Sequence, residues 1–180
     1  MGTSTLPDTL AADAGGHLRL GRWSASMGSK INSRGSVLIE SGHHRWEASA
    51  KGTGPVDALF RAVDRALRDV LGGHPRLLSY DVHAVAEGPD AEGRVTVRVA
   101  PPADAPGARS VGTYEGVAQG ANIVAASIEA YVDAIERFLA EEHWAGATDA
   151  AGNNRAAPLP AEDRPHFDDE VDPNHSRWWS

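Results

Sequence analysis

The 180-residue sequence contains no cysteine. Disulfide bonds, cysteine-based zinc sites and cysteine nucleophiles are therefore excluded. Long apolar runs are missing as well: none approaches the length needed to cross a membrane, and the N-terminus lacks the apolar core of a signal peptide. We therefore expect a cytoplasmic protein with no membrane contact, no metal site and no cofactor.

Positive charge is also scarce. The chain has 17 lysine and arginine residues against 25 aspartate and glutamate residues, a net charge of -8, and Lys30 and Lys51 are its only lysines. Such a protein repels the phosphates of nucleic acids and anionic membranes, so neither is an expected partner. The length suffices for one domain with a hydrophobic core.

Composition divides the chain into three parts. Residues 1–16 are small and polar, and residues 145–180 are rich in proline, alanine, asparagine and aspartate. Such stretches bury too little apolar surface to fold, so we expect two tails around a domain at residues 17–144. Trp178 and Trp179 stand out in the C-terminal tail. They either dock into a groove on this chain or a partner, or belong to a tail end without a docking role.

The pattern between the tails is duplicated. The segment that begins at Trp46 reappears, weakly, from Tyr114, an offset of 114 − 46 = 68 residues. In each half, three short strands precede a glycine-containing turn and a long helix with apolar residues at helical spacing. We expect strands at 18–27, 36–40, 44–48, 77–87, 94–99 and 110–117, one helix from Pro55 to the Gly72-Gly73 stop, and one after Asn122.

These elements predict an α+β fold. Duplicated βββα units form antiparallel sheets with two long helices packed on one side, and pairing of the two halves would give a sheet that carries both helices. The apolar run at 36–40 indicates a strand buried on both faces. Pro55 suits a first helical turn, and Asn122 can cap the second helix.

Three separated blocks of this pattern resemble a known family. Residues 52–60, 77–97 and 116–130 are similar, in the same order, to the C-terminal regulatory (LeuA dimer) domain of 2-isopropylmalate synthase. The likeness covers about residues 18–140. It implies the βββα duplication, a homodimer formed through these domains and feedback binding of leucine between protomers; homologous domains of citramalate synthases bind isoleucine.

The synthase barrel has no counterpart in this sequence. A TIM barrel needs about 250 residues, so we expect a free-standing regulatory-type domain without synthase activity. Its partners would be a second copy, a branched-chain amino acid or related small carboxylate, and a separately encoded synthase.

The resemblance also implies a ligand site. A helix N-terminus supplies backbone donors for a carboxylate, and a small apolar pocket suits an alkyl side chain. The matching positions are Gly52, Thr53, Gly54, Pro55, Val56, Leu77, Tyr80, Ala84, Ala91, Gly93 and Ile123. One departure precedes the second helix, where the family usually has Thr-Asp-Ile and this chain has Ala121-Asn122-Ile123. The change removes an acidic group that could anchor a ligand ammonium.

An alternative function is a small enzyme recruited from this scaffold, acting on an amino-acid-derived or other carboxylate metabolite. Its candidate groups are His83, Lys51 and Tyr80, although no nucleophile–base pair is evident. His43 and His44 point to opposite faces if both lie on a strand, so they cannot easily share a metal. Glu47 and Glu115 occupy equivalent positions of the repeat and are either acid–base groups or plain exposed carboxylates. A third possible function of the whole domain is purely structural dimerisation.

Overall fold

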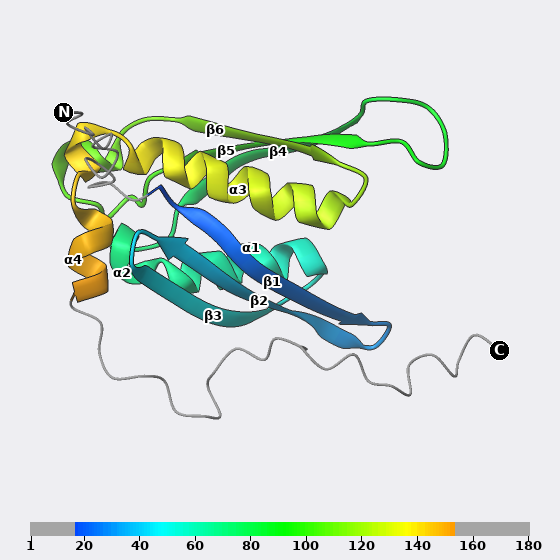
Figure 1. The fold of residues 1–180 in the computed structure, drawn as a ribbon, viewed down its shortest axis with the longest axis horizontal. Coiled ribbons are helices and arrows are strands. Elements are labelled where there is room, and N and C mark those ends of the chain that lie inside the picture. The colour runs from blue at the N-terminus through cyan, green and yellow to red at the C-terminus, as the bar shows by residue number, and fades with distance from the viewer. Residues whose placement is uncertain (1–16, 154–180) are drawn as a thin grey trace, which may run out of the picture.

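The computed structural model describes residues 17–153 (Figure 1). Its elements follow the order βββα, βββα, with short helical pieces after each unit and one more between the second and third strands of the second unit. The strands are β1 (Arg19–Gly28), β2 (Ile31–Ser41), β3 (His44–Gly52), β4 (Arg76–Ala84), β5 (Gly93–Ala100) and β6 (Tyr114–Gly120). The helical elements are α1 (Pro55–Ala66), α2 (Arg68–Leu71), η1 (Gly107–Ser110), α3 (Ile123–Leu139), η2 (Glu142–Trp144) and α4 (Ala147–Asn153). The predicted α+β class and its duplication are confirmed.

The strands form two separate antiparallel sheets, sheet A in the order β1-β2-β3 and sheet B in the order β4-β5-β6. The expectation that the halves would pair into one sheet is therefore wrong. Each sheet carries one long helix: α1 packs on β2 and β3, and α3 packs on β5 and β6. The two helices also contact each other, so the two units share one hydrophobic core. Helix–helix packing takes the place of the strand pairing that the sequence suggested.

Helix α1 lies unusually close to sheet A. A Cβ on Gly35 of β2 would lie 2.8 Å from the backbone of Ala58, and a Cβ on Gly52 of β3 would overlap the backbone nitrogen of the same residue. Both glycines are therefore required by the close approach of helix and sheet. The backbone of α1 thus rests directly on two strands.

Helix α3 approaches sheet B in the same way. A Cβ on Gly116 of β6 would overlap the Ala130 carbonyl oxygen and the Ala134 nitrogen. Asn122 caps α3 as predicted: its side chain accepts hydrogen bonds from the amides of Val124 and Ala125, both at 3.1 Å. The start and the seating of α3 are thus fixed by local residues.

The central residues of β2 are buried on both faces, as the apolar run at 36–40 predicted, with Val37, Leu38 and Ile39 all buried. Two other expectations changed. The sixth strand begins at Tyr114 rather than residue 110, because η1 occupies the residues before it. The stretch assigned to the C-terminal tail includes α4, which buries Ala147 and Ala151.

The first helix is interrupted rather than continuous. It bends at Leu67 between α1 and α2, and Gly72 ends α2 in the left-handed conformation with φ of 67°, as the predicted stop requires. Among residues 17–153, no helix is both long and apolar enough to cross a membrane. The cytoplasmic location stays a prediction, and Trp178 and Trp179 lie outside the described residues.

Candidate functional site

Most of the predicted ligand-binding residues gather at one end of the domain. Helices α1 and α3 both begin there, and the β1–β2 hairpin and the loop between β4 and β5 project from the same end (Figure 1). Of the predicted residues, only Gly52 and Gly93 are buried. The group therefore lines an open surface of the single chain.

Tyr80 forms the floor of this surface, between the two helices. Its hydroxyl lies 2.8 Å from the Ser127 hydroxyl of α3. Its ring forms a T-shaped pair with the ring of Phe60 of α1, with ring centres 6.0 Å apart. Ser127 in turn donates to the Ile123 carbonyl oxygen at 2.6 Å. Tyr80 thus links β4 to both helices. The sequence placed Tyr80 at the site but did not indicate this role.

The other site residues follow from this anchor. Val56 lies one helical turn before Phe60, and Ile123 one turn before Ser127, so each shares the helix face that contacts Tyr80 and lies one turn nearer the helix N-terminus. A Cβ on Gly93 would overlap Ile123 Cδ1 and lie 3.7 Å from Val82. The residues therefore converge on one patch with an apolar surface, hereafter the β4 patch.

The two helix N-termini at the β4 patch differ. Asn122 occupies the first amides of α3, whereas no side chain caps α1. Gly54 precedes α1 in an extended conformation with φ of -152°, and a Cβ there would meet nothing within 4 Å. The backbone of the described chain therefore does not require glycine at Gly54. The open helix end keeps unshared N–H donors for an anion.

Asp57 is a residue of this region that the sequence analysis missed. Its carboxylate accepts a hydrogen bond from the Thr53 amide at 3.0 Å and pairs with Arg61 at 3.0 Å. Burial would raise the pKa of Asp57, but the Thr53 hydrogen bond and the Arg61 guanidinium outweigh burial and lower the pKa. Asp57 thus fixes the turn before α1 while ionised. Its spacing of four residues from Arg61 was the available signal.

Leu77 is not brought to the same patch. It pairs with Val99, whereas Ala84 pairs with Gly93, six residues away along β5, which corresponds to about 20 Å. Leu77 instead belongs to a row of exposed apolar residues along β4, an edge strand of sheet B. Leu77, Leu78, Tyr80 and Val82 expose 48%, 51%, 38% and 42% of their surfaces. Such a row is unusual for a surface that stays in water.

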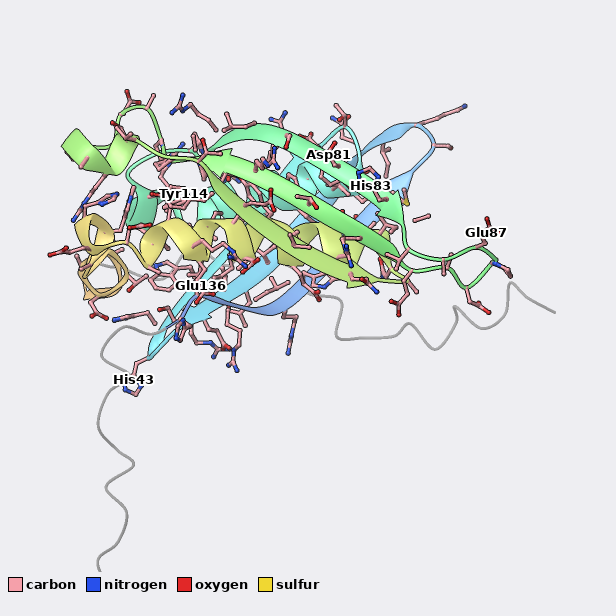
Figure 2. All side chains as sticks on the ribbon, turned by 90° about the horizontal axis from the view of Figure 1, so that it is seen from above. His43, Asp81, His83, Glu87, Tyr114 and Glu136 are labelled. Atoms are coloured by element: carbon pink, nitrogen blue, oxygen red, sulfur yellow. The ribbon has the colours of Figure 1, made fainter. Side chains whose placement is uncertain are left out.

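The candidate catalytic residues lie on three different surfaces. Tyr80 faces the helices, His83 lies on the opposite face of sheet B opposite Arg94, and Lys51 lies on the outer face of sheet A opposite Arg34. His43 and His83 lie far apart (Figure 2). Among the described residues, no three histidine, aspartate or glutamate side chains gather as a metal site would require. Glu47 and Glu115 belong to separate sheets.

A buried polar contact joins the two helices behind Tyr80. Phe60 stacks on Tyr131 with ring centres 4.2 Å apart, and the Tyr131 hydroxyl donates to Asp64 Oδ1 at 2.5 Å. Burial raises the pKa of Asp64 to about 6, although the Tyr131 hydrogen bond opposes the rise. Burial and the nearby Asp64 carboxylate also raise the pKa of Tyr131.

We expect this contact to make stability depend on pH. A carboxyl group whose pKa is higher in the folded state favours the folded state when protonated, so ionisation of Asp64 should lower the free energy of unfolding between about pH 4 and pH 6. Asp64→Asn should therefore stabilise the protein by on the order of 2 kcal/mol at pH 7.5 and by little at pH 4. Urea unfolding at both pH values measures the difference. Tyr131→Phe removes the hydrogen bond that lowers the pKa of Asp64, so the loss of stability should occur at higher pH in this variant. An effect of Asp64→Asn that does not change with pH would contradict the assignment.

Comparison with known proteins decides which family carries this arrangement. The model of the LeuA allosteric (dimerisation) domain matches residues 5–139. The chain belongs to this family. Among its relatives, a 2-isopropylmalate synthase of Salinibacter ruber is 33% identical over 82% of the chain. Those of Sediminispirochaeta smaragdinae and Ruminiclostridium cellulolyticum are 39% and 34% identical over 57% and 64% of the chain.

The LeuA dimerisation domain makes up a small part of these relatives. The matches span 26%, 18% and 20% of their respective lengths. The chain therefore spans about a fifth to a quarter of the length of these relatives. The match to residues 5–139 also includes part of the stretch that the sequence analysis assigned to an N-terminal tail.

Proposed function

We propose that this chain is a dimeric regulatory domain that binds a branched-chain amino acid or a related small carboxylate at the β4 patch. The observation that carries the proposal is the convergence of the open N-terminus of α1 and the apolar residues Tyr80, Val82 and Ile123 on one exposed surface. An amino acid combines an anionic group with an alkyl group, which this surface matches. The regulated enzyme would be a synthase barrel that lies outside these 180 residues.

Self-association is expected of a LeuA dimerisation domain, and the exposed row on β4 offers a surface for it. A symmetric dimer brings the same patch of each copy together. With the two β4 strands antiparallel, the Leu77 end of one copy would meet the Ala84 end of the other. Such an arrangement would place Leu77 of one copy at the site of the other, although within a single chain Leu77 lies about 20 Å from the Ala84 end of β4.

We expect Val82→Lys to convert the dimer into a monomer. A lysine at the centre of an apolar interface would have to lose its hydration without an acidic partner. Val117→Lys is a matched control, because Val117 is 43% exposed against 42% for Val82 but lies on the outer face of the same sheet. Light scattering should give twice the chain mass of 19.0 kDa for the wild type and the control, and the chain mass for Val82→Lys. A monomeric wild type across micromolar concentrations would remove the basis for the shared site.

Ligand binding should be visible as stabilisation. A ligand present at 100 times its Kd raises the free energy of unfolding by about 2.7 kcal/mol when it binds only the folded state. We expect leucine, isoleucine, valine or one of their keto acids to raise the Tm and to release or absorb heat in titration calorimetry. Glycine, which lacks the alkyl group, is the matched control. If no member of the panel gives heat or a thermal shift, only dimerisation is left of the proposal.

A further inference from the structure

The outer face of sheet A, opposite α1, carries cross-strand rows of polar residues. At the end away from the β1–β2 hairpin, one row places Glu40 between Arg19 and Arg45. Its carboxylate lies 2.8 Å from Arg19 and 3.2 Å from Arg45. There the sheet balances two neighbouring cations with a carboxylate of its own.

Near the hairpin, the corresponding row is unbalanced. It consists of Ser26, Arg34 and Lys51, with Arg34 directly opposite Lys51. Like charges placed opposite each other in a sheet are destabilising. No carboxylate of the described residues forms an ion pair with either cation. In an acidic protein, this pairing of cations needs an explanation beyond solubility.

A hollow lies over this row. Its volume is about 430 Å³, and it is lined by Ser26, Ile31, Asn32, Arg34 and Lys51. The lining therefore offers a guanidinium, an ammonium, a hydroxyl and an amide, the groups that bind oxyanions through charge-assisted hydrogen bonds. The volume lies in the range of small-molecule sites.

We propose that this hollow binds a small dianion, either a phosphate ester or a dicarboxylate. The charge of this ligand would balance Arg34 and Lys51, as the Glu40 carboxylate balances Arg19 and Arg45 at the other end of the sheet. The site is distinct from the β4 patch, because Arg34 and Lys51 lie on the face of sheet A that faces away from α1. Two neighbouring cations favour a doubly charged ligand over a single carboxylate. The next cross-strand pair on this face of sheet A is Ser36 and Ser49. Their hydroxyls are hydrogen-bonded at 2.7 Å, which helps to hold β2 and β3 together beside the hollow.

The test uses inorganic phosphate and succinate as separate probes at constant ionic strength, with sodium chloride as the reference. We expect at least one probe to bind saturably in calorimetry and to raise the Tm. Arg34→Gln and Lys51→Gln should each weaken binding roughly tenfold or more, since one charged hydrogen bond is lost. Arg68→Gln, at an exposed arginine of α2, should bind as the wild type does. Whether phosphate or succinate binds more tightly identifies the class of ligand.

A second measurement checks the cation pair itself. Without added dianion and at low salt, Lys51→Gln should raise the Tm above that of the wild type, because it removes the repulsion from Arg34. Any of three results would overturn the proposal. Lys51→Gln could be no more stable than the wild type, neither probe could bind, or both glutamine variants could bind the probes as the wild type does. Ala84→Leu, which alters the β4 patch, should leave dianion binding unchanged, so failure of the two sites can be told apart.

Discussion

Replacing Gly116 with alanine is expected to lower the free energy of unfolding by about 3 kcal/mol or more. The added Cβ would overlap the Ala130 carbonyl oxygen and the Ala134 nitrogen, which belong to the backbone of α3. A helix backbone cannot step aside as a flexible side chain can, so α3 must move away from sheet B. That movement would open the core around Ile135 and Phe138, both fully buried.

Gly120→Ala is the matched control for this change. Gly120 ends the same strand, and a Cβ there would meet nothing within 4 Å. Urea unfolding followed by circular dichroism should show a stability close to the wild type for the control and a large loss for Gly116→Ala. Equal stability of the two variants would mean that α3 does not lie against β6 as closely as described.

Ala84→Leu is expected to abolish ligand binding while the protein stays folded and dimeric. Ala84 is exposed on β4 beside the patch formed by Val82, Gly93 and Ile123. A leucine side chain fits an extended strand, but it would take the volume proposed for the alkyl group of the ligand. We expect no measurable heat from the amino acid that stabilises the wild type.

The control for Ala84→Leu is the same substitution at Ala108, an exposed residue of η1 at the other end of the domain. Ala108→Leu should bind the ligand with wild-type affinity. Light scattering on both variants separates loss of the site from loss of the dimer. If Ala84→Leu retains full affinity, the proposed site is wrong and the ligand binds elsewhere.

Local sequence patterns predicted much of this fold. The alternation of Tyr80, Val82 and Ala84 correctly placed these residues on one face of a strand, because side chains on a strand alternate between the two faces. The Asn122 cap and the Gly72 stop depend on neighbouring residues only, and both were predicted correctly. The duplication likewise required nothing beyond comparison of the two halves.

Features that depend on distant contacts were not predictable in this way. Whether the two halves join through strands or through helices is decided by contacts such as Phe60 on Tyr131, between residues far apart in sequence. The pairing of Arg34 with Lys51 depends on the register of β2 and β3. The distance of Leu77 from Gly93 depends on the register of β4 and β5. Periodicity gives a face for each residue but not its neighbour across the sheet.

The glycine contacts beneath α1 determine how a force at one end of the domain would travel. Because Gly35 and Gly52 seat the backbone of α1 directly on β2 and β3, no layer of adaptable side chains separates helix from sheet at these points. A displacement of the first turn of α1 would therefore move α1 and sheet A together as one rigid body, since closely packed interiors transmit displacement with little compression. The part of this unit farthest from the first turn of α1 is the β2–β3 turn, between Ser41 and His44, so a small tilt at Gly54 would produce its largest displacement there.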